Sequence, residues 1–404
     1  MLIEKSTPYK QHQPRNEFMK IPYGRHDIQS SDVNAVVEVL KSDFLTQGPM
    51  VPNFEEKVSR YCAAKYAIAV TSATSALHIS LMALGIGKDD LVWTSPNTFL
   101  ATANAALYCG AQIDFVDIDT QTYNICASEL KHKLENAAKK NRLPKAVIPV
   151  HFAGQPCDMR SIHDLSKEYG FYVIEDASHA MGGNYLNYKI GSCRYSDITV
   201  FSFHPVKIIT TAEGGVALTN NDKLAQKLRL FRSHGVTRDP NLMSNVTPEP
   251  WHYEQVALGY NYRMNDIQAV LGANQVSRLD SYVKSRHAIA DRYNSDLSHL
   301  PLRLPYQTED GYSAYHLYVV LIEKSHDLSR KTVFEELRSR GIIVSVHYIP
   351  VHTQPYYRQL GFKIGQFPKA EAYYDKAISL TIYPTLSEND QNYIINSLKT
   401  ILRK

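Results

Sequence analysis

The sequence predicts an α/β protein in which a large domain, built on a mixed and mostly parallel sheet, precedes a smaller C-terminal α+β domain. Between about residues 29 and 231, helical patterns alternate with short apolar runs, as expected when crossover helices join parallel strands. A loop rich in Pro, Asn and Asp (237–251) then leads into a long helical pattern. These two observations place the domains at residues 22–250 and 251–404, after a polar N-terminal extension over residues 1–21.

The composition excludes several classes of protein. Hydrophobic residues make up 44% and charged residues 21% of the 404, which is typical of a folded globular chain. A net charge of +4 is too small for a nucleic-acid-binding surface, and five cysteines without a C-x-x-C pair argue against a disulfide framework or a zinc site. The N-terminus has no apolar signal segment, and the uncharged stretch 66–87 is too polar to span a membrane. We therefore expect a cytoplasmic protein with no metal, nucleic-acid or membrane partner.

The elements of the large domain follow from apolar periodicity. Two helices come first, one with Val33, Val36, Val37 and Leu40 on one face and the other over about 54–64. Strands are then expected at 66–70, 91–93, 113–118, 146–152, 172–175, 198–203 and 216–219, and helices near 73–84, 98–109, 128–139, 159–169 and 222–231. The order of these elements predicts crossover connections along most of the sheet.

The C-terminal part begins with a helical pattern over about 265–297, which leaves room for a break. Strands are expected at 315–322, 342–347 and 379–383, and helices near 330–340, 368–377 and 388–402. Helices and strands that do not alternate regularly favour a small α+β unit.

Small residues follow the first predicted strand, in the run TSATSAL at 71–77. A strand end turns into a helix there, so an anion such as phosphate could contact the backbone N–H groups of the first turn, an end that the helix dipole favours for negative charge. The alternative is a helix start made of small residues only so that two elements can pack closely.

Two further strand ends carry chemically active side chains. Asp176 and His179 follow a buried strand in YVIEDASHA, at the sheet edge where α/β proteins bind ligands. Lys207 follows another strand in FSFHPVKIITTAEGG, and a lysine near apolar walls has a lowered pKa and is a usable amine. The alternatives are a helix cap for Asp176 and solvated surface positions for His179 and Lys207.

Together these features match the demands of pyridoxal phosphate chemistry: a lysine for the Schiff base, an acid for the pyridine nitrogen and an anion site. A nicotinamide enzyme is disfavoured, because no third glycine follows Gly85 and Gly87. His347 and His352 could be metal ligands, but no acidic or cysteine cluster lies near them in the sequence.

Seven segments extend this interpretation to a family resemblance: LTQG (45–48), SATSAL (72–77), FLATANA (99–105), EDASHA (175–180), 202–215, FRSHG (231–235) and YNYRMNDIQ (260–268). Over about residues 22–402 the chain resembles the DegT/DnrJ/EryC1/StrS family of sugar aminotransferases. The resemblance implies the fold type I architecture of pyridoxal phosphate transferases, with pyridoxal 5′-phosphate as the cofactor.

The resemblance also implies roles for individual residues. Lys207 would form the Schiff base and move the proton during transfer, Asp176 would bind the pyridine nitrogen, and His179 would lie beside the ring hydroxyl. Phe99 would stack on the cofactor ring.

The same resemblance implies that the phosphate is held by the backbone amides of Ala73 and Thr74 and by the hydroxyl of Ser202. Asn261 would reach this phosphate from the other subunit of a homodimer, so that each active site is shared between two chains.

Within the family, the runs 202–215, 228–235, 251–268 and 346–357 are similar to enzymes that transfer the amino group of glutamate to C4 of a UDP-linked 2-acetamido-2,6-dideoxy-4-keto-hexose. This implies that His347 and Tyr348 contact the nucleotide-sugar, with Arg263 and Glu213 as weaker candidates. Alternatively, His347 and Tyr348 cap the predicted strand and pack under the turn at 355–357.

There are three alternative functions, and the sequence disfavours two of them. The acceptor could be another nucleotide-linked 3- or 4-keto-sugar. A pyridoxamine-dependent sugar dehydratase is disfavoured because its relatives replace the lysine by histidine. A non-catalytic regulator is disfavoured because the N-terminal residues are too few and too rich in proline for a DNA-binding module.

Overall fold

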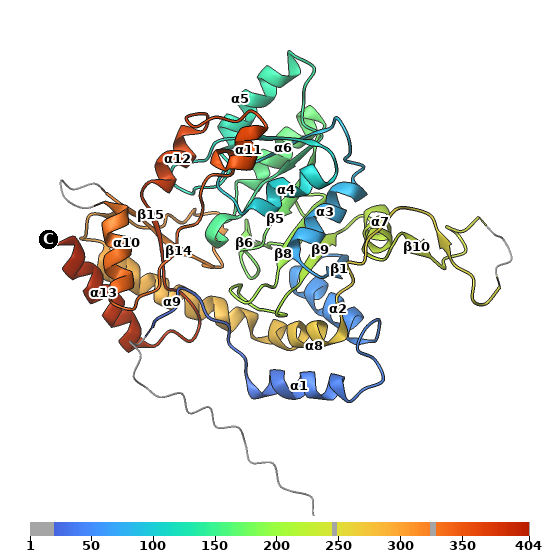
Figure 1. Ribbon diagram of the computed structural model, residues 1–404, viewed down its shortest axis with the longest axis horizontal. Coiled ribbons are helices and arrows are strands. Elements are labelled where there is room, and N and C mark those ends of the chain that lie inside the picture. The colour runs from blue at the N-terminus through green and yellow to red at the C-terminus, as the bar shows by residue number, and fades with distance from the viewer. Residues whose placement is uncertain (1–19, 245–248, 324–328, 404) are drawn as a thin grey trace, which may run out of the picture.

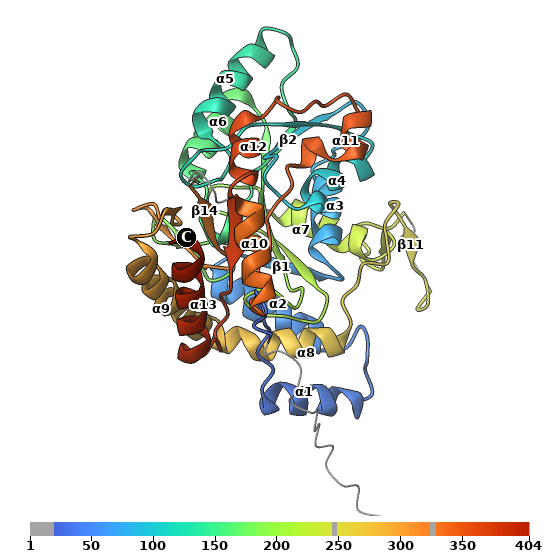
Figure 2. The same cartoon turned by 60° about the vertical axis from the view of Figure 1, so that its left-hand side comes forward.

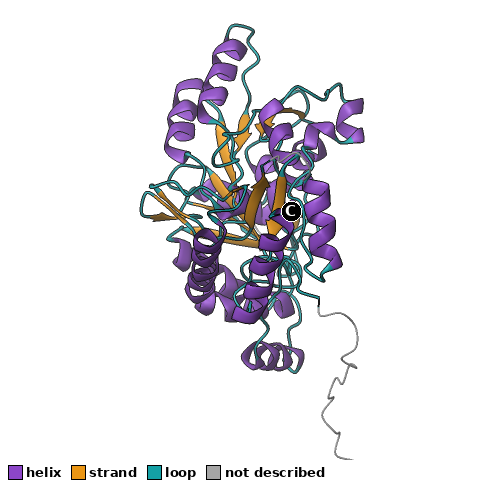
Figure 3. Cartoon of the chain, turned by 90° about the vertical axis from the view of Figure 1, so that its left-hand side faces the viewer, coloured by secondary structure: helices purple, strands orange, loops and turns teal. Residues whose placement is uncertain are grey.

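The computed structural model describes residues 20–244, 249–323 and 329–403, and its centre is a seven-stranded sheet (Figures 1 and 3). In spatial order the strands are β1 (Tyr66–Val70), β9 (Gly215–Thr219), β8 (Ile198–Ser202), β5 (Tyr172–Asp176), β4 (Ala146–Ile148), β2 (Leu91–Thr94) and β3 (Gln112–Phe115). All pairings are parallel except those of β9, which runs antiparallel to β1 and β8. The predicted α/β class with a mixed, mostly parallel sheet is therefore confirmed.

Helices cover both faces of this sheet (Figure 3). One face packs against α2 (Met50–Cys62), α5 (Ala127–Ala138), α6 (Met159–Tyr169) and α8 (Asp266–Gln275), and the other against α3 (Ala73–Ala83), α4 (Leu100–Tyr108) and α7 (Asp222–Arg232). Along β5 the side chains alternate, with Val173 in the first core and Ile174 in the second. The same alternation sends Glu175 and Asp176 to opposite faces.

A long connector leads from the main sheet to the C-terminal part (Figure 2). It consists of α8, the 3₁₀ turn η2 (Val276–Arg278) and α9 (Leu279–Leu297), so the expected break falls at η2. The elements beyond it are the antiparallel strands β12 (Leu302–Arg303), β14 (Tyr318–Ile322) and β15 (Ala377–Leu380) and the helices α10 (Arg330–Ser339) and α13 (Glu388–Leu402). Their buried apolar side chains form a third core with α9.

Short elements link the two parts. They are η1 (Phe152–Gly154), β6 (Asn184–Tyr185), β7 (Tyr188–Lys189), β10 (Val236–Thr237), β11 (Glu254–Gln255), β13 (Gly311–Tyr312), η3 (Val351–Thr353), α11 (Pro355–Gln359) and α12 (Pro368–Tyr374). β13 pairs with β6, and the Tyr357 hydroxyl of α11 donates to Asn104 of α4 over 2.6 Å. The C-terminal part is thus joined to the large one through several contacts, which include the N–H groups of Lys369 and Ala370 in α12 donating to Asp117 over 2.9 and 3.0 Å.

Helix α1 (Ser30–Leu40) does not pack against the protein through the apolar face that the sequence predicts. Its contact with α8 is made by buried Asp32, which accepts hydrogen bonds from Arg278 at 2.6 and 2.8 Å and from Asn274 at 2.6 Å. Val33 and Leu40, on the predicted apolar face, are 52% and 56% exposed. The face of α1 that packs therefore combines Asp32 with buried Val39, while Val33 and Leu40 face outward.

One predicted strand is wrong. Residues 342–347 form only isolated bridges, Ile21 with Ile342 and Ser345 with Ser379, because this segment changes its partner after three residues. Several other strands are shorter than expected, and those predicted at 113–118 and 379–383 are found at Gln112–Phe115 and Ala377–Leu380. The strand predicted at 146–152 ends at Ile148, before Pro149, which has no N–H to donate to the sheet. The strand predicted at 315–322 starts at Tyr318, since Tyr315 has a φ of 45°.

The predicted domain boundary after residue 250 falls between the two paired strands of the β10–β11 hairpin and stays a prediction. The N-terminal extension lies outside the described residues, apart from its end at 20–21. Within the described ranges no helix combines the length and the apolar character needed to cross a bilayer.

Candidate active site

The site begins where β5 and β8 end side by side. The strands pair in parallel, with Asp176 beside Val200, so their carboxyl ends lie at the same edge of the sheet. Asp176 is the last residue of β5, and Lys207 follows β8 in a turn in which its N–H donates to the carbonyl of His204 over 2.9 Å. The two side chains are close enough for the charge of Asp176 to act on Lys207.

The Asp176 carboxylate is 5% exposed and is held by hydroxyl groups on both oxygens. Oδ2 accepts from Thr102 over 2.6 Å, and Oδ1 accepts from the hydroxyl and the N–H of Ser178 over 2.6 and 3.2 Å. These three donors fix the orientation of the carboxyl group in a place that water barely reaches. The sequence analysis missed Thr102, although Thr98 and Thr102 share one face of the predicted helix and hydrogen bond to each other over 2.7 Å.

Lys207 is the basic group that faces this carboxylate. Burial disfavours its ammonium form and lowers its pKa to about 8, although the charge of Asp176 acts in the opposite direction. A lysine with an ordinary pKa is almost fully charged at neutral pH, whereas here an appreciable fraction is a free amine. The side chain is thus available as a nucleophile and as a base.

His179 is neutral and held in one tautomer. Its Nδ1 accepts the N–H of Ala153 over 3.2 Å, so the ring proton resides on Nε2, which donates to the Tyr348 hydroxyl oxygen over 3.1 Å. Its pKa lies well below the ordinary value because of burial, with smaller contributions from Lys207 and His347. The ring also lies 4.4 Å from that of His316, a contact that the sequence did not indicate.

The start of α3 lies against the end of β8 through a glycine. Gly215 pairs with Ser202, and a Cβ on Gly215 would lie 2.4 Å from the carbonyl carbon of Ser72 and 2.5 Å from the nitrogen of Ala73. Ser72 caps the helix by accepting the N–H of Ser75 over 3.1 Å. The backbone of Ser202 therefore lies near the start of α3 at Ala73 and Thr74, an end that the helix dipole makes positive, and the phosphate site there stays a prediction.

An aromatic side chain borders the site on its open side. Phe99 precedes α4, is 59% exposed, and its ring lies 6.1 Å from that of Tyr348. Tyr348 in turn contacts His179. The ring of the expected cofactor would therefore lie between Phe99 and the sheet edge.

Three predicted residues lie apart from this group. Arg263 donates to the Ser233 hydroxyl over 3.0 Å, Asn261 is exposed and bridges to Ser233, and Glu213 is exposed in the turn before Gly214. Within the described ranges no hydrogen bond or ion pair joins them to Lys207 or Asp176. The 261–263 segment nevertheless adjoins the phosphate-site candidates, since Thr71 N–H donates to the Tyr262 carbonyl over 2.9 Å.

His347 is held inside the protein. Its Nδ1 lies 2.8 Å from the Ser379 hydroxyl, and its carbonyl accepts the Tyr373 hydroxyl over 2.7 Å. Burial, and secondarily Lys207, lowers the pKa of His347 to about 4, so the ring is neutral. These contacts are with β15 and α12 rather than with the turn at 355–357, and Tyr348 reaches His179 directly.

Metal ligation has little support in the described ranges, where no three His, Cys, Asp or Glu side chains gather as a metal site. His352 has a different partner, since its Nε2 lies 2.8 Å from the Glu371 carboxylate of α12.

Comparison with known proteins gives consistent matches along the chain. A sequence profile of the DegT/DnrJ/EryC1/StrS aminotransferase family matches residues 26–399. The spore coat polysaccharide biosynthesis protein SpsC of Bacillus subtilis is 40% identical over 397 residues, which cover 97% of this chain and 99% of that protein. The UDP-4-amino-4,6-dideoxy-N-acetyl-beta-L-altrosamine transaminase of Campylobacter jejuni is 36% identical over 385 residues, 95% of this chain and 98% of that protein.

A solved structure of an aminotransferase also matches this chain over most of its length. Helicobacter pylori PseC, described as an aminotransferase involved in the biosynthesis of pseudoaminic acid, superposes with a TM-score of 0.86. It is 31% identical, and the match covers 95% of this chain and 99% of that one.

The close approach at Gly215 leads to a test of the phosphate site. Gly215→Ala should push β9 away from α3, cost about 1–3 kcal/mol of folding stability and weaken pyridoxal phosphate binding about tenfold. Gly87→Ala is the control, because a Cβ at Gly87 meets nothing within 4 Å. Thermal unfolding and cofactor titration measure both variants, and equal cofactor affinity in the two would contradict the assignment.

Proposed function

Because the chain belongs to the DegT/DnrJ/EryC1/StrS aminotransferase family and its cofactor is pyridoxal phosphate, we propose that it transfers the amino group of glutamate to C4 of a UDP-linked 2-acetamido-2,6-dideoxy-4-keto-hexose. The product would be UDP-4-amino-4,6-dideoxy-N-acetyl-β-L-altrosamine. The observation that carries the proposal is the approach of a partly buried lysine with a pKa of about 8 to a buried aspartate at the edge of the sheet.

The bound cofactor supplies an electron sink that makes the α-proton of an amino acid acidic. Lys207 would hold the cofactor covalently and, once released, move a proton as base and then as acid, a role that its lowered pKa suits. The Asp176 carboxylate would keep a proton on the pyridine nitrogen. The neutral His179, fixed by Ala153 and Tyr348, would orient the ring from the side of its hydroxyl group.

The remaining binding roles follow from position. The N–H groups of Ala73 and Thr74 and the Ser202 hydroxyl would bind the phosphate, because Ala73 lies against Gly215, Thr74 follows it in the first turn of α3, and Ser202 pairs with Gly215. The exposed Phe99 ring would cover the outer face of the cofactor.

We further infer a homodimer from surfaces that a monomer leaves exposed. Exposed apolar side chains occur on α1, on the loop after it and on the hairpin that projects beside α7 in Figure 1; they include Val33, Val37, Leu40, Phe44, Leu45, Trp251 and Leu258. Trp251 and Leu258 are 72% and 75% exposed, and apolar patches of this kind mark interaction sites. A two-fold contact would bring exposed Asn261 of the partner subunit to the phosphate.

The choice of acceptor rests on the relatives. The altrosamine transaminase of Campylobacter jejuni supports the UDP-4-keto-sugar at 36% identity, whereas the spore coat polysaccharide protein at 40% leaves room for another nucleotide-linked 3- or 4-keto-sugar. On this chain Tyr348 and His347 would contact the nucleotide-sugar, with Arg263 and Glu213 as further candidates.

Lys207 can be tested through the rate of cofactor capture. As the pH rises through about 8, the amine loses its proton, so the rate at which cofactor-free protein gains the visible absorbance of bound pyridoxal phosphate should rise with a midpoint near 8. Lys207→Ala should gain no such band, and Asp176→Asn should gain it but lose about a hundredfold or more of turnover. A midpoint near the ordinary lysine pKa, or a normal band in Lys207→Ala, would refute the assignment.

The shared site can be tested by mixing two inactive proteins. A mixed dimer of Asn261→Ala and Lys207→Ala chains places both lesions in one site and leaves the other whole, so activity should return to about half that of wild type per mixed dimer. Each variant refolded alone is the control. If activity stays absent in the mixture, or light scattering finds an active monomer, the shared site is wrong.

The acceptor can be tested with a panel of UDP- and dTDP-linked 3- and 4-keto-sugars, with glutamate as donor and 2-oxoglutarate as the signal. The UDP-4-keto-sugar should give a kcat/KM at least about tenfold above any other, because each lost substrate contact costs about that much. Lys207→Ala protein measures the background. A faster reaction with a dTDP-3-keto-sugar would leave only the general sugar aminotransferase assignment.

A further inference from the structure

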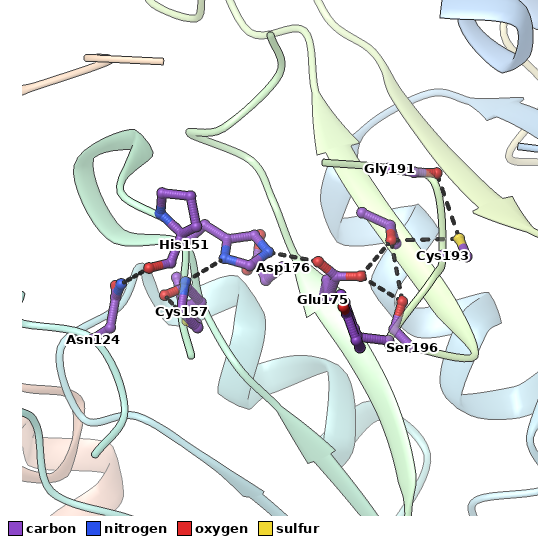
Figure 4. A network of polar contacts seen from close by, with 12 residues as sticks. Asn124, His151, Cys157, Glu175, Asp176, Gly191, Cys193 and Ser196 are labelled. Atoms are coloured by element: carbon purple, nitrogen blue, oxygen red, sulfur yellow. Dashed lines mark hydrogen bonds and ion pairs between the residues drawn. The ribbon is translucent and has the colours of Figure 1, made fainter. Parts of the chain in front are cut away.

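Glu175, which immediately precedes Asp176, points to the opposite face of β5 and is 4% exposed (Figure 4). Its Oε2 accepts a hydrogen bond from His151 Nε2 over 2.7 Å, and its Oε1 accepts from the hydroxyls of Ser196 and Thr199 over 2.5 and 2.9 Å. Burial alone would raise the pKa of Glu175, but the combined effect of these donors holds it below its ordinary value. The interior behind β5 therefore contains a carboxylate that is ionised and fully hydrogen bonded.

His151 connects this carboxylate to the backbone of the active site. The ring is completely buried, and its Nδ1 accepts the N–H of Cys157 over 3.0 Å, so its proton lies on Nε2 and points at Glu175. The backbone N–H of His151 donates to the Asp176 carbonyl over 3.1 Å, and Asp176 N–H donates to Pro149 over 2.9 Å. The imidazole thus ties the 149–157 loop to Glu175, while the backbone of the same loop is hydrogen bonded to the backbone of Asp176.

The same loop determines the state of His179. Asn124 accepts the N–H of Phe152 over 2.9 Å and donates to the carbonyls of Gln155 and Pro156 over 2.9 and 3.0 Å. Ala153, between these points, has a φ of 59° and aims its N–H at His179 Nδ1. If the loop shifted, His179 would lose the donor that selects its tautomer.

We propose that Glu175 and His151 are positioning residues for the amino transfer. They fix the 149–157 loop, and the loop holds His179 as the Nε2–H tautomer and holds the backbone of Asp176. An apolar pair of the same volume would stabilise the interior at least as well, so what this buried pair adds is orientation. The inference rests on the proposed function, because it needs Asp176 and His179 to act on the cofactor.

Matched variants test this inference. Glu175→Gln and His151→Phe weaken the network, while Glu371→Gln and His352→Phe make the same chemical changes in a second His–Glu pair, at 2.8 Å between η3 and α12, in which His352 is buried and Glu371 half-buried. All four should lower the thermal unfolding midpoint. Only the first two should lower kcat, by about tenfold, and move the pH midpoint of the bound cofactor's absorbance, with the KM for glutamate changed less than about twofold.

A second readout needs no activity. In cofactor-free protein labelled with ¹⁵N-histidine, His179 should give the Nε2–H pattern in wild type and in both control variants, and should lose it in His151→Phe. The inference is overturned if Glu175→Gln and His151→Phe match their controls in kcat, absorbance and tautomer. Absence of a visible cofactor band in wild type would instead overturn the proposed function.

Discussion

The candidate site depends on the parallel pairing of β5 with β8. The register places Asp176 beside Val200, and Lys207 follows seven residues later at the same edge, so two strands about 4.8 Å apart bring the acid and the amine together. A slip of one residue would exchange the faces of Glu175 and Asp176. The carboxylate that is held by Thr102 would then point into the His151 network, and the chemistry would be lost although the sheet persisted.

The second constraint is that charged groups are costly to bury. The protein solves this differently for its carboxylates, its histidine and its lysine. Asp176 and Glu175 are carboxylates surrounded by hydroxyl or imidazole donors, whereas His179 is neutral because burial and nearby Lys207 disfavour its protonation. The charge of Asp176 acts on Lys207 but does not outweigh burial, so the pKa of Lys207 is lowered. The result is a site in which one group, the lysine, can change its protonation state near neutral pH.

The third constraint concerns the apolar side chains that are exposed on the surface. α1 packs through Asp32 and leaves Val33 and Leu40 outside, and the hairpin before α8 exposes Trp251. In the proposed homodimer, the second subunit would cover these exposed apolar side chains. Because Asn261 lies at the base of the same hairpin, assembly and completion of the phosphate site would be one event.

The sequence by itself determined the α/β class, the order of most elements and three of the central side chains, because periodicity and strand ends are local properties. α6 and α13 have the expected bounds for this reason, and Asp176, His179 and Lys207 all lie at one edge. Only the tertiary structure decided which distant groups meet them. Thr102, Ala153 and the Glu175–His151 pair act through contacts between segments many residues apart, and no local pattern records such contacts. The failed strand at 342–347 and the outward apolar face of α1 have the same origin, since their environments are set by neighbours rather than by their own periodicity.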